Sequence, residues 1–148
     1  MSANTTFEMA VESIDLAKAE NAYFGKLAQV AWAAVRELGL RFKLDEELQY
    51  PVWADASDWQ KKLAIYTARF WLENKEKNPP DSIIHDKWVN HQIHSGWRYG
   101  VVSDPDEKKD NRLMPFTFLS DKHVLMTRLF RVVVESCHTL GGYHSFYD

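Results

Sequence analysis

Apolar residues recur at three- and four-residue steps through the N-terminal part of the chain. This spacing is typical of an α-helix with one apolar face. The positions that form the stripe are Val11, Ile14, Phe24, Leu27, Ala31, Val35 and Leu38. The stripe is long for one globular helix, so we expect a break near Glu20–Asn21 and an end at Gly39, a residue type favoured at helix C-termini.

Three further helices are predicted, each beginning at a residue that can cap a helix N-terminus. Ser57 opens a capping-box pattern, and Ser120 precedes the last apolar stretch. Between them, Asp81 precedes a helix that Gly96 closes. The expected apolar faces carry Trp59, Leu63, Tyr66, Phe70 and Trp71, then Ile84, Trp88 and His91, then Val124, Leu125, Leu129, Phe130 and Val133. Gly141–Gly142 is expected to stop the last helix.

Little of the chain is predicted to be extended. Tyr99–Val102 is a candidate strand, and Asp104–Asp106 contains a proline between two aspartates, which is a turn signal. We therefore expect a short β-hairpin near Tyr99–Leu113. The predicted fold class is mainly α: a compact helical domain over residues 50–148, preceded by an N-terminal helical extension over residues 1–49.

Composition narrows the classes of function. The chain has 148 residues and is 45% hydrophobic, which is typical of one folded domain. Its net charge of −3 gives no overall attraction to nucleic acid or to an anionic membrane. One cysteine, no apolar run long enough for a membrane span and no secretory signal together predict a cytoplasmic protein.

Aromatic and basic side chains gather around one Gly-Trp corner. The candidate ligand-binding residues are His85, Trp88, Trp97, Arg98, Tyr99, Lys108, Arg112 and Phe116. Aromatic faces beside fixed positive charge suit a planar anion such as a nucleotide. In this interpretation the aromatic rings stack on the base, and Arg98 and Arg112 bind the phosphates.

Each of these residue types also has a structural explanation. Trp88 lies on a helix face and is equally a candidate for the core, and Trp97 is a candidate to plug the end of that helix. Lys108 and its neighbour Lys109 are more simply the solvated flank of an acidic turn. His85 is expected to hold a backbone or aromatic neighbour by a hydrogen bond.

Metal binding and catalysis are not predicted. His91 and His94 lie three apart, but the chain has neither a His-Glu-x-x-His motif nor a Cys-x-x-Cys partner. Cys137 and His138 are adjacent, so on a helix their side chains point apart and cannot form a base-activated thiol. We expect a protein that is not an enzyme, without cofactor or metal.

The Gly-Trp corner also resembles the RyR domain, the ryanodine-receptor repeat. That family's pattern is a helix with His and then Trp, a Gly-Trp-x-Tyr-Gly turn, a charged turn and Arg-Leu-x-Pro-aromatic. The resemblance covers roughly residues 50–143, and matching positions are His85, Trp88, Gly96, Trp97, Tyr99, Gly100, Lys108, Arg112, Leu113, Pro115, Phe116, Leu119, Gly142 and Tyr143. The departures are Gln92 for a usual Lys or Arg, Asp110 and Asn111 for a usual His/Asn-Pro pair, and Thr127 for a common acid.

The resemblance implies a free-standing domain that binds an adenine-nucleotide-like ligand. It favours a sensor or sponge for a nucleotide second messenger, ADP-ribose-like or cyclic, in signalling or antiviral conflict of a prokaryote or phage. The alternatives are a protein-interaction or structural module and, last, a nucleotide hydrolase. Because related repeats pack in pairs, the stripe from Phe24 to Leu38 is expected to fill the missing half or to form a homodimer.

Overall fold

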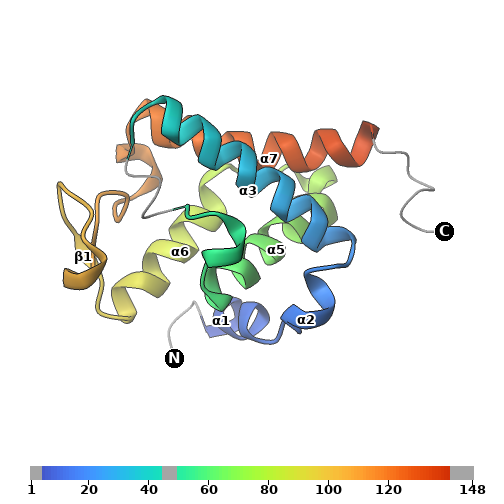
Figure 1. The fold of residues 1–148 in the computed structure, drawn as a ribbon, viewed down its shortest axis with the longest axis horizontal. Helices are drawn as coiled ribbons and strands as arrows, with labels where there is room; N and C mark the ends of the chain where they lie inside the picture. Colours follow the sequence, from blue (N-terminus) through green and yellow to red (C-terminus); the bar gives the residue numbers. More distant parts are fainter. Residues whose placement is uncertain (1–4, 45–49, 141–148) are drawn as a thin grey trace.

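The computed structural model describes residues 5–44 and 50–140, and most of them are helical (Figure 1). The α-helices are α1 (Thr5–Glu12), α2 (Leu16–Ala19), α3 (Tyr23–Arg41), α5 (Asp58–Glu73), α6 (Ser82–His94) and α7 (Asp121–Leu140). Short 3-10 turns occupy Trp53–Asp55, Lys75–Lys77, Pro105–Glu107 and Phe116–Phe118, and the strands are β1 (Arg98–Tyr99) and β2 (Lys109–Asp110). The predicted mainly helical fold class is confirmed.

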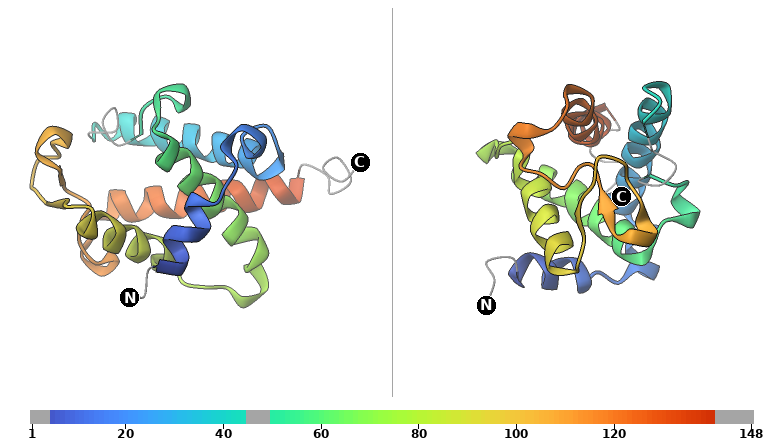
Figure 2. Two further views of the ribbon diagram at one scale, coloured as in Figure 1. Left: turned by 90° about the horizontal axis from the view of Figure 1, so that it is seen from below. Right: turned by 90° about the vertical axis from the view of Figure 1, so that its left-hand side faces the viewer.

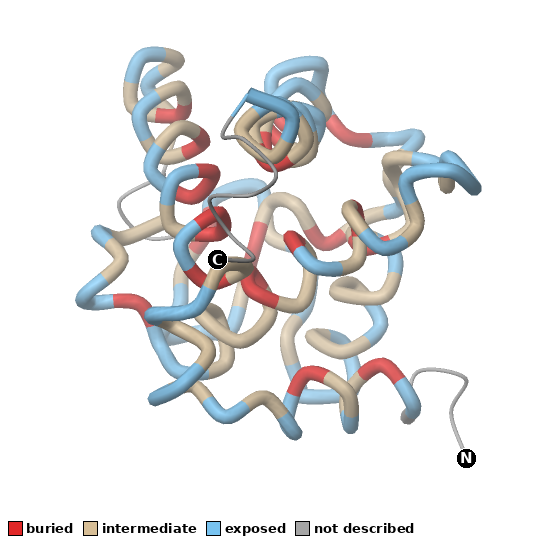
Figure 3. Tube along the Cα trace, turned by 90° about the vertical axis from the view of Figure 1, so that its right-hand side faces the viewer, coloured by how far each residue is buried: buried red, intermediate tan, exposed pale blue. Residues whose placement is uncertain are grey.

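The hydrophobic core lies where α3, α5 and α7 meet. Helices α3 and α7 run side by side over α5, while α1 and α2 pack on the other side of α5 (Figures 1 and 2). Buried positions of α3, α5 and α7 form one core cluster, and Figure 3 shows where the buried residues lie along the chain. From α3 these are Leu27, Ala28, Ala31, Trp32 and Val35, and from α7 they are Met126, Phe130 and Val134.

The apolar stripe of α3 is therefore used inside the chain. Leu27, Ala31 and Val35 are buried against α5 and α7 in the same core cluster. The stripe is thus part of the core of this chain, and its predicted role as a substitute for the missing paired repeat stays a prediction. A homodimer stays a prediction. Because the stripe is buried inside the chain, it is not the surface through which two copies would pair. The boundary between 1–49 and 50–148 also stays a prediction, although residues on both sides of it share one core.

The N-terminal helices differ in detail from the prediction. The chain does break near Glu20, between α2 and α3, and it breaks once more after α1. Gly25 fits the close approach of α2 to α3, because a Cβ built there would lie 1.9 Å from the Ala19 carbonyl oxygen. Gly39, however, does not end the helix: it is buried inside α3, and the left-handed turn falls at Lys43, with φ 57°. Gly39 is buried and Leu38 packs against the core, and these contacts outweigh the local preference of glycine for a helix terminus.

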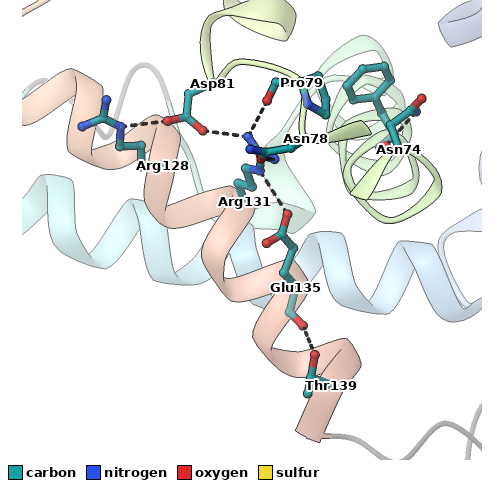
Figure 4. Close-up of polar contacts among 9 residues, drawn as sticks. Asn74, Asn78, Pro79, Asp81, Arg128, Arg131, Glu135 and Thr139 are labelled. Carbon is teal, nitrogen blue, oxygen red and sulfur yellow. Dashed lines mark hydrogen bonds and ion pairs between the residues drawn. The ribbon is translucent and has the colours of Figure 1, made fainter. Parts of the chain in front are cut away.

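The beginnings of α5 and α6 show two different ways to fix a helix. Ser57 and Gln60 form the predicted capping box, with reciprocal bonds of 3.1 and 2.9 Å. Asp81 precedes α6 as predicted but makes no side-chain cap bond. Its carboxylate instead accepts hydrogen bonds of 2.9 Å from both Arg128 and Arg131 of α7 (Figure 4). The start of α6 is thus fixed by its neighbour helix.

The predicted β-hairpin is wrong in its strand direction. The strands β1 and β2 are parallel, with Arg98 paired to Lys109 and Tyr99 to Asp110. The chain reverses twice between them, the second time through an antiparallel bridge from Asp104 to Lys109. Two reversals restore the original direction, and turn residues alone do not reveal that. This loop projects from the helical body beyond the end of α6 (Figure 2).

The last helix begins as predicted. Ser120 Oγ accepts a hydrogen bond from the His123 backbone N–H at 3.3 Å. The predicted stop at Gly141–Gly142 lies outside the described residues. Within the described part of the chain, none of the helices combines the length and the apolar character needed to cross a bilayer.

Candidate functional site

A cavity of about 150 Å³ lies among α3, α5, α6 and α7. Its lining residues are Trp32, Tyr50, Gln60, Leu63, Ala64, Thr67, Trp71, Ile84, His85, Trp88, Arg112, Leu119, His123, Met126, Thr127 and Phe130. Trp71, Met126 and Phe130 are buried, whereas Tyr50, Gln60 and Trp88 are partly exposed. The cavity thus has an apolar floor and a rim with aromatic and polar groups.

The aromatic residues of the wall are held in place by their own contacts. Trp32 Nε1 donates a hydrogen bond of 2.7 Å to the Pro51 carbonyl oxygen, and its ring lies 4.7 Å from that of Tyr50 at 58°. Trp71 is 2% exposed. On the other side, Trp88 projects from α6 beside His85, with 5.6 Å between the ring centroids. These rings present a wall with little freedom to move.

Arg112 is the permanently charged residue of the lining, and it is paired with Asp110. Its Nε and Nη2 donate to the two carboxylate oxygens at 3.2 and 3.0 Å, and its backbone N–H donates at 2.8 Å. The guanidinium also lies over the rings of Trp88 and Tyr50, 4.7 and 5.6 Å from their centroids. The positive charge at the cavity is therefore fixed in a stack and balanced by a neighbouring carboxylate.

Asp110 stays ionised although it is buried. Burial by itself raises the pKa of its carboxyl, but the charge and hydrogen bonds of Arg112 outweigh that effect and hold the pKa below its ordinary value. The charge of His123 acts in the same direction. The pair therefore contributes a negative charge as well as a positive one to this part of the site.

His85 is neutral at pH 7. Burial lowers the pKa of its ring below 6.5, and the hydrogen bond to the Met114 carbonyl oxygen, 2.9 Å from Nε2, opposes this only in part. Because a carbonyl only accepts, we assign the ring proton to Nε2. The ring lies between Trp88 and Phe116, 5.9 Å from the latter. The predicted hydrogen bond of His85 to the backbone is thus present.

The predicted site residues fall into two groups. His85, Trp88 and Arg112 line the cavity, and Phe116 packs behind His85 without lining it. The others, Trp97, Arg98, Tyr99 and Lys108, lie past the end of α6 and do not line it.

The second group surrounds the turn at Gly96. Gly96, which was predicted to close this helix, has a positive φ of 92°, a conformation that glycine adopts without strain. Lys108 Nζ donates to the Ser95 carbonyl oxygen at 3.2 Å, and Arg98 and Tyr99 are exposed in β1. Trp97 is half-buried, with its backbone N–H bonded to the Gln92 carbonyl oxygen at 2.9 Å. The first group thus lines the cavity, whereas the second surrounds the turn that follows α6, and a ligand role for the second group stays a prediction.

Sequence reasoning missed much of the cavity wall. Trp32 and Tyr50 come from the chain before α5, and Gln60 and Thr67 come from the polar positions of α5. One residue could have revealed this part of the wall from the sequence. His123 lies among the apolar positions of the last helix, and a buried histidine usually has a specific partner; here it bonds Ser120 Oγ at 3.0 Å. Trp71 was predicted as core, and it is both core and cavity wall.

The model of the RyR domain family matches residues 81–141. The chain contains an RyR domain. The match runs from the start of α6 into the end of α7, so it includes His85, Trp88, Arg112 and His123 but leaves Trp32 and Trp71 outside. The cavity therefore forms between the RyR segment and the helices that precede it. No solved structure matches this chain.

Proposed function

We propose that this RyR-domain protein binds a nucleotide-derived small molecule in the cavity and does not transform it. The supporting observation is the stack of Arg112 on Trp88 in a wall that also includes Trp32, Tyr50 and Trp71. A concave, mainly apolar site with a few directed polar groups is the usual form of a small-molecule pocket. Stacking of a planar base on such rings contributes about 1–3 kcal/mol per base.

Binding without chemistry suits a cytoplasmic sensor or sponge for a nucleotide signal, ADP-ribose-like or cyclic. Two polar residues of the lining, Thr67 and Thr127, donate their hydroxyl protons to the Leu63 and His123 carbonyl oxygens, and their Oγ1 atoms keep the capacity to accept a hydrogen bond from the edge of a base. A ligand of this kind stabilises the folded chain by an amount that grows with the logarithm of its concentration relative to Kd, and reaches about 2.7 kcal/mol at a hundredfold excess over Kd.

The test is calorimetric titration with mononucleotides, cyclic nucleotides and ADP-ribose, after a thermal-shift screen. Trp88→Ala should weaken binding of the best ligand by about 10–100-fold, since one stacking partner is lost. Trp97→Ala is the matched control, because it removes an indole from the same segment but outside the cavity. Loss of binding in Trp97→Ala alone would move the site to the Gly96 turn, and a wild type that binds none of the compounds would contradict the proposal.

A protein-interaction module is the second candidate function. Val101 and Val102 are 79% and 70% exposed at the tip of the loop that projects beyond α6, with Tyr99 and Ile93 also exposed nearby in the chain. Apolar side chains at a projecting tip favour contact with another protein. Under this alternative, Val101→Asp with Val102→Asp abolishes a partner contact in a pull-down, while Trp88→Ala preserves it.

A further inference from the structure

The charge balance at the cavity limits which part of a ligand it can hold. Arg112 is 18% exposed and its guanidinium already lies against the Asp110 carboxylate, which is 8% exposed. A phosphate approaching Arg112 would have to displace this buried partner or lie beside it. Both routes are unfavourable, because a buried carboxylate left without its cation is costly and two anions repel.

The other ionisable residues of the lining do not supply a replacement cation. His85 is neutral, with its Nε2 directed at the Met114 carbonyl oxygen. His123 Nδ1 bonds Ser120 Oγ at 3.0 Å, and the electrostatic effect of its ring is directed at the same Asp110 carboxylate that Arg112 contacts. Among the residues that the structure describes, no lysine lines the cavity. Arg98 and Lys108 belong to the turn beyond α6 and are exposed there.

The size of the cavity points the same way. A volume of about 150 Å³ is that of a cavity known to admit a benzene-sized ring. Pockets that enclose a whole drug-sized ligand measure about 300–1,000 Å³. The space among Trp32, Trp71 and Trp88 thus suits one planar ring system, while a sugar phosphate attached to it would extend past the rim into water.

We infer that the cavity recognises the uncharged base of its ligand, and that the ligand's phosphate stays in solvent and adds little affinity. This inference rests on the proposed function. Arg112 acts as a flat, charge-balanced part of the wall: the face of a base can stack on it, and the edge of a base can accept a hydrogen bond from it. Asp110 excludes a phosphate from Arg112. The ligand class is a nucleobase or nucleoside unit, whether or not that unit carries phosphate.

The experiment compares each nucleoside with its own 5′-monophosphate by calorimetry on the full chain. The probes are adenosine, guanosine, cytidine and uridine, each with AMP, GMP, CMP and UMP. For the base that binds best, the two Kd values should agree within about fivefold, the range of a solvent-exposed ion pair. They should also change little between low and high salt, since no phosphate contact is screened. A monophosphate that binds the wild type more tightly than that limit would overturn the inference and leave the proposed function standing.

Asp110→Asn tests whether the Asp110 charge is what keeps a phosphate away from Arg112. The substitution keeps the shape of the side chain but removes the charge that balances Arg112. The variant should prefer the monophosphate over the nucleoside by at least about tenfold, because a guanidinium without a carboxylate partner binds phosphate. Asp106→Asn, an exposed acid of the same loop, is the matched control and should keep the wild-type ratio.

Each outcome is decisive. If Asp110→Asn keeps its helical circular dichroism and shows no preference for the monophosphate, Arg112 does not face the ligand and the charge argument is overturned. If the variant does not fold, the ratio measured on the wild type decides alone. If the wild type binds none of these probes and none of the cyclic nucleotides and ADP-ribose of the first screen, the proposed function fails, and the inference fails with it.

Discussion

Two arginines of this protein lie over tryptophan rings, and their surroundings assign them different roles. Arg131 lies 4.2 Å from the Trp71 ring centroid, and Arg112 lies 4.7 Å from that of Trp88. Arg131 of α7 donates to four acceptors among the described residues: Asn78 Oδ1, the Pro79 carbonyl oxygen, Asp81 Oδ1 and Glu135 Oε1, at 2.8–3.1 Å (Figure 4). Arg112 is paired with a carboxylate only two positions before it in the chain.

The two arginines differ in the sequence separation between the arginine and its partners. Arg131 joins α7 to the segment before α6, 50 positions away at Asp81, so its bonds form only when the chain has folded. The Arg112–Asp110 pair is close in sequence and is already near in the unfolded chain, so it adds less to the free energy of folding. Arg131 stabilises the fold that holds the cavity, whereas Arg112 shapes the cavity itself.

The largest effect is expected for Arg131→Ala. The change leaves Pro79, Asn78 and Glu135 without their donor. Because the Arg131 side chain is 11% exposed and its partners are partly exposed, the free energy of unfolding should fall by about 2–3 kcal/mol. Urea unfolding followed by circular dichroism measures it. A loss below about 1 kcal/mol would show that the bonds of Arg131 contribute no more than an ordinary solvent-exposed ion pair.

A smaller loss of stability is expected for Arg112→Ala. Because its partner is close in sequence, the free energy of unfolding should fall by about 1–2 kcal/mol, chiefly from the uncompensated Asp110 carboxylate. The same urea titration applies. If Arg112→Ala loses as much stability as Arg131→Ala, the claim that Arg112 contributes less to the free energy of folding is contradicted.

Arg128→Ala sharpens the comparison, because Arg128 shares the Asp81 carboxylate with Arg131. Its side chain is 57% exposed, so solvent and salt screen the pair, and the expected loss is about 0–1 kcal/mol. Thermal unfolding should place this variant close to the wild type. If Arg128→Ala lowers the free energy of unfolding as much as Arg131→Ala does, the stabilisation comes from pairing the Asp81 carboxylate and not from the long-range bonds of Arg131.

The smallest effect is expected at His85 and appears only as a pH dependence. Burial lowers the pKa of the folded-state ring below 6.5, so the unfolded chain binds the proton more readily. The stabilising contribution is complete above that pH and is lost as the pH falls below it toward the folded-state pKa. His85→Gln keeps a donor for the Met114 carbonyl oxygen but removes the titration.

Unfolding measured from neutral to mildly acidic pH should therefore show a shallower decline in His85→Gln than in the wild type. Exposed His94 supplies the control, since His94→Gln changes a histidine of the same helix. Parallel curves for the wild type and His85→Gln would refute the buried neutral state of His85.

Local sequence was sufficient for most helices and for one part of the site. The spacing of apolar residues located α3, α5, α6 and α7, and Ser57 with Gln60 identified the start of α5. The motif around Trp88 and Arg112 identified the RyR segment and three of the residues that line the cavity. These features depend on contacts between near neighbours in the chain. The spacing of apolar residues and the capping hydrogen bonds are both set by residues a few positions apart.

Tertiary structure decided what those faces meet. The period of α3 shows that Leu27 and Val35 are buried, but not that α5 and α7 cover them. The same limit hid Trp32 and Trp71 from the predicted site, made β1 and β2 parallel, and turned Asp81 from a helix cap into the partner of Arg131. Each of these outcomes depends on where helices cross and which distant groups they bring within bonding distance, and a one-dimensional pattern of polar and apolar residues does not contain that geometry.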